Sequence, residues 1–219
     1  MKPRQFDLIV FDWDGTLSDS TGLIVLCMQS ACADIGVPVP SKEKAAYVIG
    51  LGLQDALAHA VPDLPRERYR ELALRYRHHY MARANELVLF DGVLPMLQGL
   101  KARNHWLAVA TGKNRSGLNE ALAHSQMGPL FDATRTADET QSKPHPQMLL
   151  ELMREFGAAP ERTLMIGDTT HDLQLAANAG TASIGVSYGA HESAAFKNFN
   201  THFIAHSARE LHEWLTSHG

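Results

Sequence analysis

The sequence contains few of the features that mark redox, zinc-binding or disulfide-bonded proteins. Its only cysteines are Cys27 and Cys32, which lie five positions apart in a segment with helical spacing. They form neither a CxxC redox pair nor part of a four-ligand zinc site. We therefore expect two reduced thiols and a reducing compartment, with the cytoplasm as the default location.

Long apolar runs and an excess of basic charge are also missing. No stretch approaches the roughly 18 apolar residues of a membrane helix. The first apolar run, residues 6–11, is broken by acidic residues and does not resemble a secretory signal. Lys and Arg number 20 against 24 Asp and Glu, a formal net charge of −4. Because non-specific nucleic-acid binding needs a basic surface, we expect no nucleic-acid partner. Because no long apolar run is present, we expect no membrane partner either.

Short apolar runs alternate with helical patterns along most of the chain. This alternation predicts an α/β fold with a doubly wound parallel sheet, in a Rossmann-like arrangement. Strands are expected at residues 6–11, 106–110, 163–166, 181–186 and 202–205. Helices are expected at residues 93–103, 116–124, 146–156, 173–179 and 209–215.

One long segment interrupts the alternation. Between about residues 20 and 87 the sequence has only helical patterns, at 23–35, 43–49, 53–59 and 66–84. The segment is too long for a simple crossover between two parallel strands. We therefore predict an inserted α-helical cap domain at residues 19–88, and a core domain formed by residues 1–18 and 89–219.

Polar clusters follow three of the predicted strands. They are Asp-Trp-Asp-Gly-Thr at 12–16, Thr-Gly-Lys at 111–113 and Gly-Asp-Thr-Thr-His-Asp at 167–172. A fourth cluster, Ser-Lys-Pro at 142–144, precedes a helix. In doubly wound sheets, ligands bind beyond the carboxyl ends of the strands, so these side chains are placed for chemistry.

The residue types in these clusters favour phosphoryl transfer. Asp12 and Asp14 are two positions apart and face one side of an extended segment, and Asp168 adds a third acid from another strand. Carboxylates held together repel unless a cation lies between them or one of them takes a proton. Oxygen ligands in a small cluster, together with a substrate phosphate, suit Mg²⁺. Lys143 and the hydroxyl of Thr111 can neutralise and bind the transferring group.

These clusters resemble the four motifs of the haloacid dehalogenase superfamily, in the family's order and along nearly the whole chain. Residues 12–16 are similar to the DxDGT motif, Thr111 to the second, Lys143 to the third, and Asp168 with Asp172 to the fourth. The helical insert lies where the smaller cap class of the family has its cap. Residues 169–180 and the Asp19-Ser20 pair resemble the phosphoglycolate-phosphatase-like group.

The resemblance implies a role for each matching residue. Asp12 would attack phosphorus and carry an aspartyl phosphate, and Asp14 would act as acid and then as base. Thr111 and Lys143 would hold the phosphoryl oxygens. Mg²⁺ would be held by Asp12, the backbone carbonyl of Asp14, and Asp168. Phosphate-binding positions implied by the motifs are Gly15, Thr16, Gly112 and Lys143, and Asp172 would orient Lys143 or a metal-bound water.

Several neighbouring residues have simpler interpretations. His145 and His171 occupy positions that the family pattern leaves variable, so we expect no catalytic role for them. The arginines between residues 66 and 77 are interpreted as a solvated helix face, with attraction of anionic substrates as the alternative. The glycine-rich segment 50–54 is expected to be a turn between helices, with a role in substrate selection as the alternative.

Other activities share some of these motifs. A haloacid dehalogenase has no need of Asp14 or the metal set, and a phosphonoacetaldehyde hydrolase needs a lysine that the helix at 23–35 lacks. A phosphomutase of the β-phosphoglucomutase kind shares all four motifs and stays open. A non-catalytic binding role is disfavoured by the intact set of acids and Lys143.

We thus expect an enzyme of the phosphoric monoester hydrolase class that acts on a small phosphorylated metabolite. Phosphoglycolate is the first candidate by group resemblance, and pyrophosphate, a nucleoside monophosphate or a sugar phosphate stay open. The residues that select the substrate lie in the cap, where the motifs give no guidance. The oligomeric state is not readable from the sequence.

Overall fold

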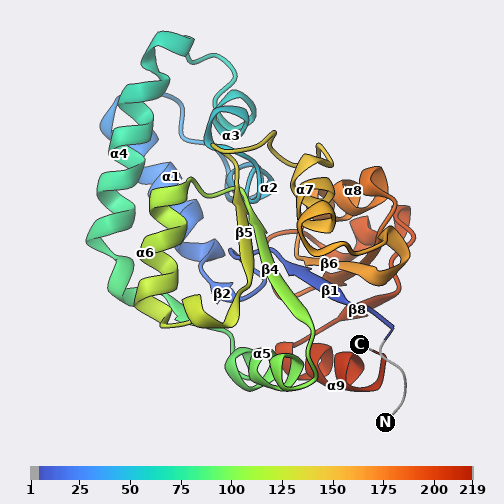
Figure 1. Cartoon of the computed structure of the whole chain (residues 1–219). Coiled ribbons are helices and arrows are strands. Elements are labelled where there is room, and N and C mark those ends of the chain that lie inside the picture. The colour runs from blue at the N-terminus through green and yellow to red at the C-terminus, as the bar shows by residue number, and fades with distance from the viewer. Residues whose placement is uncertain (1–4, 219) are drawn as a thin grey trace.

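A six-stranded parallel sheet forms the centre of the computed structural model, which describes residues 5–218 (Figure 1). The strands lie in the order β5-β4-β1-β6-β7-β8. They are β1 (Leu8–Phe11), β4 (Trp106–Thr111), β5 (Ala133–Thr136), β6 (Thr163–Gly167), β7 (Ala182–Val186) and β8 (Phe203–Ala205). Because the chain runs outward from β1 in both directions, β1 marks the switch point at which such sheets bind ligands.

Helices cover both faces of the sheet, which confirms the predicted α/β fold. Alternate residues of β1 point to opposite faces, so Ile9 and Val10 belong to two different apolar clusters. A strand buried on both faces is apolar throughout, which is why its sequence shows a continuous run. The cluster of Ile9 includes residues of α5 (Val93–Ala102), α6 (Arg115–Ser125) and α9 (Ala208–His218), and the cluster of Val10 includes residues of α7 (Gln147–Phe156) and α8 (Thr170–Ala179).

Strand β5 was not predicted from the sequence. It lies at the edge of the sheet beside β4, and three of its four residues are only partly buried. Its sequence Ala-Thr-Arg-Thr has no apolar run, because an edge strand with one accessible side does not need one. Arg135 instead forms ion pairs with Glu151 at 2.8 Å and Glu155 at 2.7 Å on α7.

The inserted segment is helical, as predicted. It contains α1 (Thr21–Asp34), α2 (Lys42–Tyr47), α3 (Leu53–Ala60) and α4 (Tyr69–Ala82), with a short 3₁₀ turn at Arg66–Arg68. Its helices share a separate apolar cluster that includes Met28, Leu57 and Leu72, so this cap has its own core.

A short antiparallel ribbon lies at both ends of the insert. Ser18–Asp19 (β2) pairs with Val88–Leu89 (β3), with Ser18 opposite Leu89 and Asp19 opposite Val88. Two-residue strands are too short for side-chain periodicity to indicate them. We propose this ribbon as the boundary between the core and the cap.

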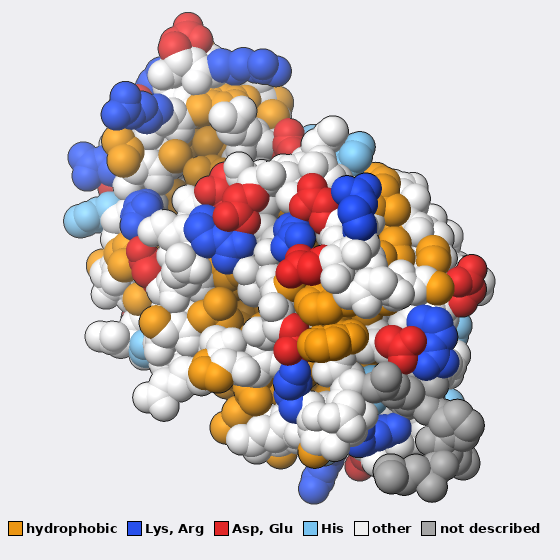
Figure 2. Space-filling view, in the orientation of Figure 1, with side chains coloured by type: hydrophobic (Ala, Val, Ile, Leu, Met, Phe, Trp, Pro, Cys, Tyr) orange, Lys and Arg blue, Asp and Glu red, His pale blue; other side chains and the backbone are white. Residues whose placement is uncertain are grey.

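The surface of the cap mixes charged and apolar side chains (Figure 2). Arg68 pairs with Glu71 on the same helix at 2.9 Å, and Arg77 reaches Glu120 of the core at 3.1 Å. Both pairs are largely exposed, so each contributes little to stability. Within residues 5–218, no helix has the length and apolar character needed to cross a bilayer.

Candidate active site

The carboxyl ends of β1, β4 and β6 meet at one edge of the sheet. Because β1 lies between β4 and β6 in parallel register, the residues that follow these strands come together. Asp12 follows β1, Thr111 ends β4 and Asp168 follows β6; all three are almost completely buried. Lys143, from the segment before α7, reaches the same place.

A buried ion-pair network holds Lys143 between two acids. Its ammonium donates to Asp12 Oδ1 at 2.7 Å and to Asp172 Oδ1 at 2.6 Å. All three side chains are at most 1% exposed. Taking one charged partner away from such a site leaves another charge buried without compensation, so the three groups form a single unit.

The first turn of α8 fixes Asp172. The side chain of Thr169 caps this helix, and Asp172 Oδ2 in return accepts the Thr169 amide at 3.1 Å and its hydroxyl at 2.7 Å. This reciprocal capping box leaves Asp172 Oδ1 for Lys143. The Asp172 carboxylate therefore caps α8 with one oxygen and orients Lys143 with the other.

Asp168 is held by two segments distant in the sequence. Thr16 donates its hydroxyl to Asp168 Oδ1 at 3.0 Å, and the Ala190 amide donates to Oδ2 at 2.7 Å. Gly15 has φ +81° and passes so close that an added Cβ would collide with the Asp168 carboxylate. Sequence reasoning missed Ala190; the only available signal was the glycine at 189, shortly after the strand that ends at Val186.

Gly15 and Thr16 stabilise the turn that follows β1. The Gly15 amide donates to the Ser18 carbonyl at 2.8 Å and the Thr16 amide to the Trp13 carbonyl at 3.4 Å. Together with the Thr16 hydroxyl bond to Asp168, these bonds build the turn after β1. The phosphate contact expected for Gly15 and Thr16 stays a prediction.

Asp14 lies at the boundary between core and cap. Ser20 donates its hydroxyl to Asp14 Oδ1 at 2.7 Å, and Lys113 pairs with Oδ2 at 3.0 Å. The Lys113 ammonium also donates to the hydroxyl of Tyr80 on α4 at 3.0 Å. Sequence reasoning did not identify Lys113 or Tyr80 as site residues, although Lys113 directly follows the Thr-Gly pair of the second motif.

The buried acids fit a divalent cation. Asp12, Asp168 and Asp172 each place one carboxylate oxygen so that the three oxygens lie within 4.8 Å of one another. Asp12 Oδ2 is buried and has no hydrogen-bond partner among the residues that the structure describes. Lys143 pairs with Asp12 and Asp172 but not with Asp168, so three ionised carboxylates would face one ammonium and leave two negative charges for a cation to balance. Oxygen donors of this kind suit Mg²⁺.

Burial also governs the ionisation of these groups. It raises the pKa of Asp12 to about 7; Asp172 and Asp14 add to this rise, while Lys143 opposes it. Burial likewise raises the pKa of Asp168 well above its usual value, with Asp12 and Asp172 contributing. Burial alone would lower the pKa of Lys143, but the two carboxylates beside it more than offset this, so the ammonium stays charged.

The cap closes directly over this edge of the sheet. A Cβ added to Gly112 would lie 2.5 Å from the Leu51 carbonyl, and the Gly52 amide donates to the Ser142 hydroxyl at 2.7 Å. A Cβ added to Gly50 would lie 3.3 Å from Thr169 Oγ1, so the glycine-rich segment 50–54 is next to three of the four motif clusters. A role for it in substrate selection stays a prediction.

Two histidines attach α2 of the cap to the core. His171 Nε2 and His191 Nε2 lie 2.8 and 3.0 Å from the Tyr47 carbonyl, and the His191 ring stacks on the Tyr47 ring at 5.2 Å. The Thr170 amide donates to His191 Nδ1, so Nε2 carries the proton that reaches Tyr47. Burial lowers the pKa of both histidines. His145, in contrast, contacts the neighbouring Gln147 amide.

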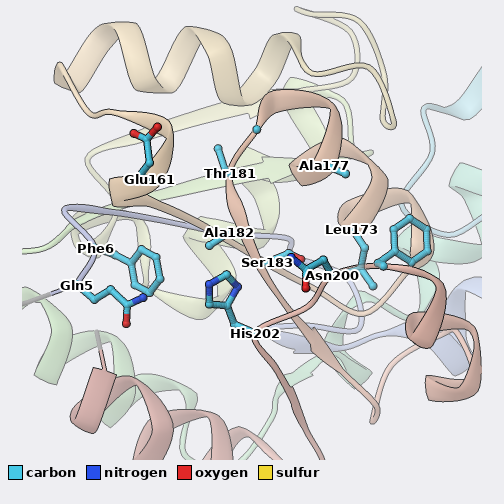
Figure 3. A pocket seen from close by; sticks show the side chains of 12 residues that line it. Gln5, Phe6, Glu161, Leu173, Ala177, Thr181, Ala182, Ser183, Asn200 and His202 are labelled. Carbon is cyan, nitrogen blue, oxygen red and sulfur yellow. The ribbon is translucent and has the colours of Figure 1, made fainter.

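A cavity of about 390 Å³ lies apart from these groups (Figure 3). Its walls include Phe6, which precedes β1, and Thr181 and Ala182 at the start of β7, so it opens at the amino ends of the strands. Among the described residues that line it, Glu161 is the only one that carries a formal charge at neutral pH. None of the described residues that line it offers a cation for a phosphate or a pair of acids, so we do not assign the chemistry to it.

Asp168→Asn provides a test of the cation site. We expect the Mg²⁺ concentration for half-maximal activity to rise by at least about 10-fold, because a buried anionic ligand is lost. The metal-free variant should melt a few degrees higher, since fewer buried carboxylates repel one another while Asn can still bond with Thr16 and Ala190. Magnesium titration and thermal melting measure both effects. Exposed Asp63→Asn is the matched control, and an unchanged titration for Asp168→Asn would place the metal elsewhere.

Comparison with known proteins identifies the family. The chain belongs to the haloacid dehalogenase-like hydrolases, whose family pattern matches residues 9–186. It is 35% identical over 217 residues to "Probable phosphatase IndB" of Dickeya dadantii, covering 96% of this chain and 92% of that protein. It is 33% identical over 222 residues to a 5'-nucleotidase of Pseudomonas aeruginosa, covering 96% of each. The crystal structure of a predicted phosphoglycolate phosphatase from Haemophilus somnus has a TM-score of 0.84 at 27% identity, covering 96% of this chain and 98% of that one.

Proposed function

We propose that this protein is a Mg²⁺-dependent phosphatase that hydrolyses a small phosphate monoester through an aspartyl phosphate on Asp12. The observation that carries this proposal is the state of the Asp12 carboxylate. One oxygen is fixed by Lys143, and the other is buried without a hydrogen-bond partner among the described residues. The lone pairs of this oxygen are therefore available to attack an electrophile such as the phosphorus of a phosphate ester. The relatives that are named phosphatases and nucleotidases support the same reaction class.

The first half of the reaction transfers the phosphoryl group to the enzyme. Asp12 Oδ2 attacks phosphorus, the bond between phosphorus and the ester oxygen breaks, and Asp14 gives its proton to the departing oxygen. Lys143 holds Asp12 in position and offsets negative charge on the phosphoryl group. The hydroxyl of Thr111, which accepts the Lys113 amide at 3.2 Å, has its own proton left for a phosphoryl oxygen.

The second half returns Asp12 to its carboxylate form. Asp14, now ionised, takes a proton from a water molecule as that water attacks phosphorus, and the bond to Asp12 breaks to release inorganic phosphate. Asp12, Asp168 and the Asp14 carbonyl would hold Mg²⁺, which when bound supplies charge neutralisation for the phosphoryl oxygens. Asp172 keeps Lys143 directed at Asp12 throughout.

The substrate that we propose is a small phosphorylated metabolite, with phosphoglycolate first. The named phosphoglycolate phosphatase structure supports this order, and the 5'-nucleotidase relative makes a nucleoside monophosphate the second candidate. Cys27 and Cys32 are both buried and free, which fits the reducing cytoplasm that we propose as the compartment.

Phosphate release from a panel of esters tests this function. The panel holds phosphoglycolate, a nucleoside monophosphate, a sugar phosphate and pyrophosphate, each with Mg²⁺ and then with EDTA. We expect Mg²⁺-dependent release, led by one ester. Release that EDTA leaves unchanged would contradict the metal site. Absence of release from every ester would contradict the phosphatase, and sugar-bisphosphate-dependent isomerisation would then indicate a mutase.

A further inference from the structure

Lys113 is a buried cation held jointly by the core and the cap. It follows β4 in the core, and its ammonium lies 3.0 Å from both Asp14 Oδ2 and the Tyr80 hydroxyl on α4. The ammonium is also 4.8 Å from the centre of the Tyr80 ring, close enough for a cation–π contact. Only 11% of the Lys113 side chain is exposed. This position ties a charged group of the core to the cap helix beside the proposed acid.

Two donors at this position have no acceptor in the part of the chain from residue 5 to 218. An ammonium carries three protons, and Asp14 and Tyr80 account for two of those of Lys113. The Tyr80 hydroxyl accepts from Lys113, so its own proton is left over. Burial raises the pKa of Tyr80, which keeps this hydroxyl protonated. Two adjacent free donors, one of them cationic, are the chemistry that binds an anion.

The reaction geometry brings the departing part of the substrate to the same place. A catalytic acid must come within hydrogen-bond distance of the oxygen that it protonates. Asp14 Oδ2 is itself 3.0 Å from the Lys113 ammonium. The atoms attached to the ester oxygen therefore come to lie beside Lys113 and Tyr80. Tyr76 stacks on Tyr80 at 5.8 Å between ring centres and limits the movement of its ring.

We infer that Lys113 and Tyr80 form a subsite for an anionic group on the alcohol portion of the phosphate ester. This inference rests on the proposed function and narrows its substrate class to esters whose alcohol carries a carboxylate or a second phosphoryl group. The anion takes the free protons of Lys113 and Tyr80 and competes with Asp14 for the ammonium. Asp14 is thereby released toward the departing oxygen. In this poorly solvated position the attraction between opposite charges is stronger than in water.

A pair of matched esters tests the subsite. Phosphoglycolate and 2-hydroxyethyl phosphate are similar in size and differ in whether the alcohol portion ends in a carboxylate or a neutral hydroxyl. Wild-type protein should prefer the first, and Lys113→Met should lower the ratio of the two kcat/KM values by roughly 10- to 100-fold, as for loss of a charge-assisted hydrogen bond. Lys113→Arg should retain most of the preference, and Tyr80→Phe should reduce it by a few-fold. The exposed Lys197→Met is the control for net charge.

The ratio of the kcat/KM values for the two esters distinguishes a substrate-binding role of Lys113 from a purely structural one. If Lys113→Met lowers kcat/KM for both esters by the same factor, Lys113 acts only on Asp14 and the inference is wrong. It is also wrong if the wild-type protein prefers the neutral ester or a nucleoside monophosphate. Failure of the wild-type protein to hydrolyse any ester would contradict the proposed function instead. In that case calorimetric binding of phosphoglycolate still decides: weaker binding on Lys113→Met supports the subsite, and unchanged affinity overturns it.

Discussion

Replacement of Asp12 by Asn is expected to lower kcat by at least about 10³-fold for every ester that the protein hydrolyses. An amide oxygen is a poor nucleophile, and among the described residues no other carboxylate combines burial with an unpartnered oxygen. The fold should survive, because Asn can still accept the Lys143 ammonium that now bonds to Oδ1. Steady-state phosphate release, with thermal melting as a check on folding, measures the effect.

Asp19→Asn is the matched control for this substitution. It removes the same charge seven residues later, from an exposed position, and should leave kcat within a few-fold of the wild-type value. Near-normal turnover by Asp12→Asn would remove Asp12 as the nucleophile. The search would then turn to Asp168 and Asp172, the other buried acids of the cluster.

Replacement of Lys143 by Met is expected to affect both turnover and stability. Turnover should fall by at least about 10²-fold, because the charge that faces the phosphoryl group is lost. The free energy of unfolding should fall by about 3 kcal/mol near pH 8, because Asp12 and Asp172 are left buried without their shared cation. Denaturant titration and phosphate release measure the two effects separately.

The loss of stability in this variant should depend on pH. In the folded wild-type protein the pKa of Asp12 is raised from 3.8 to about 7, so the protonated form is the one that folding favours. A group of this kind supports folding at low pH and loses that contribution as the pH rises through its folded pKa. Lys143 opposes the rise, so Lys143→Met moves the pKa of Asp12 higher still. The stability gap between variant and wild type should therefore be small near pH 4 and widen above pH 7.

A second substitution separates charge from packing. Adding Asp172→Asn to Lys143→Met removes one of the two stranded carboxylates while keeping an oxygen for the Thr169 amide. We expect this double variant to recover part of the lost stability and none of the lost activity. No recovery would mean that the cost of Lys143→Met comes from packing, and unchanged stability in the single variant would contradict the buried network.

The buried strands of the core were predictable because their physical environment is uniform. Strands β1, β4 and β6 are covered on both faces, so their sequences are apolar until the sheet ends and polar residues begin. The strand ends therefore indicated where Asp12, Thr111 and Asp168 lie. Edge strand β5 and the two-residue strands of the ribbon carry no such pattern, and the sequence did not reveal them.

The sequence indicated that the acids and the lysine of the candidate site lie close together, whereas the groups that hold them could not be predicted. Ala190 fixes Asp168 through a backbone amide, which every residue except proline possesses, so its identity carries no signal. The contact of Lys113 with Tyr80 joins positions 33 residues apart and depends on how the cap lies against the core. The expected task of Thr16 was phosphate binding, and the structure directs its hydroxyl to Asp168.

Trapping the covalent intermediate tests the central claim most directly. The protein would be mixed with Mg²⁺ and its best ester, quenched in acid during turnover, digested, and analysed by mass spectrometry. We predict that the peptide containing Asp12 gains the mass of one phosphoryl group, that fragmentation places the group on Asp12, and that Asp12→Asn shows no such peptide. Rapid turnover with Asp12 unmodified, or with the phosphoryl group on another residue, would contradict the account.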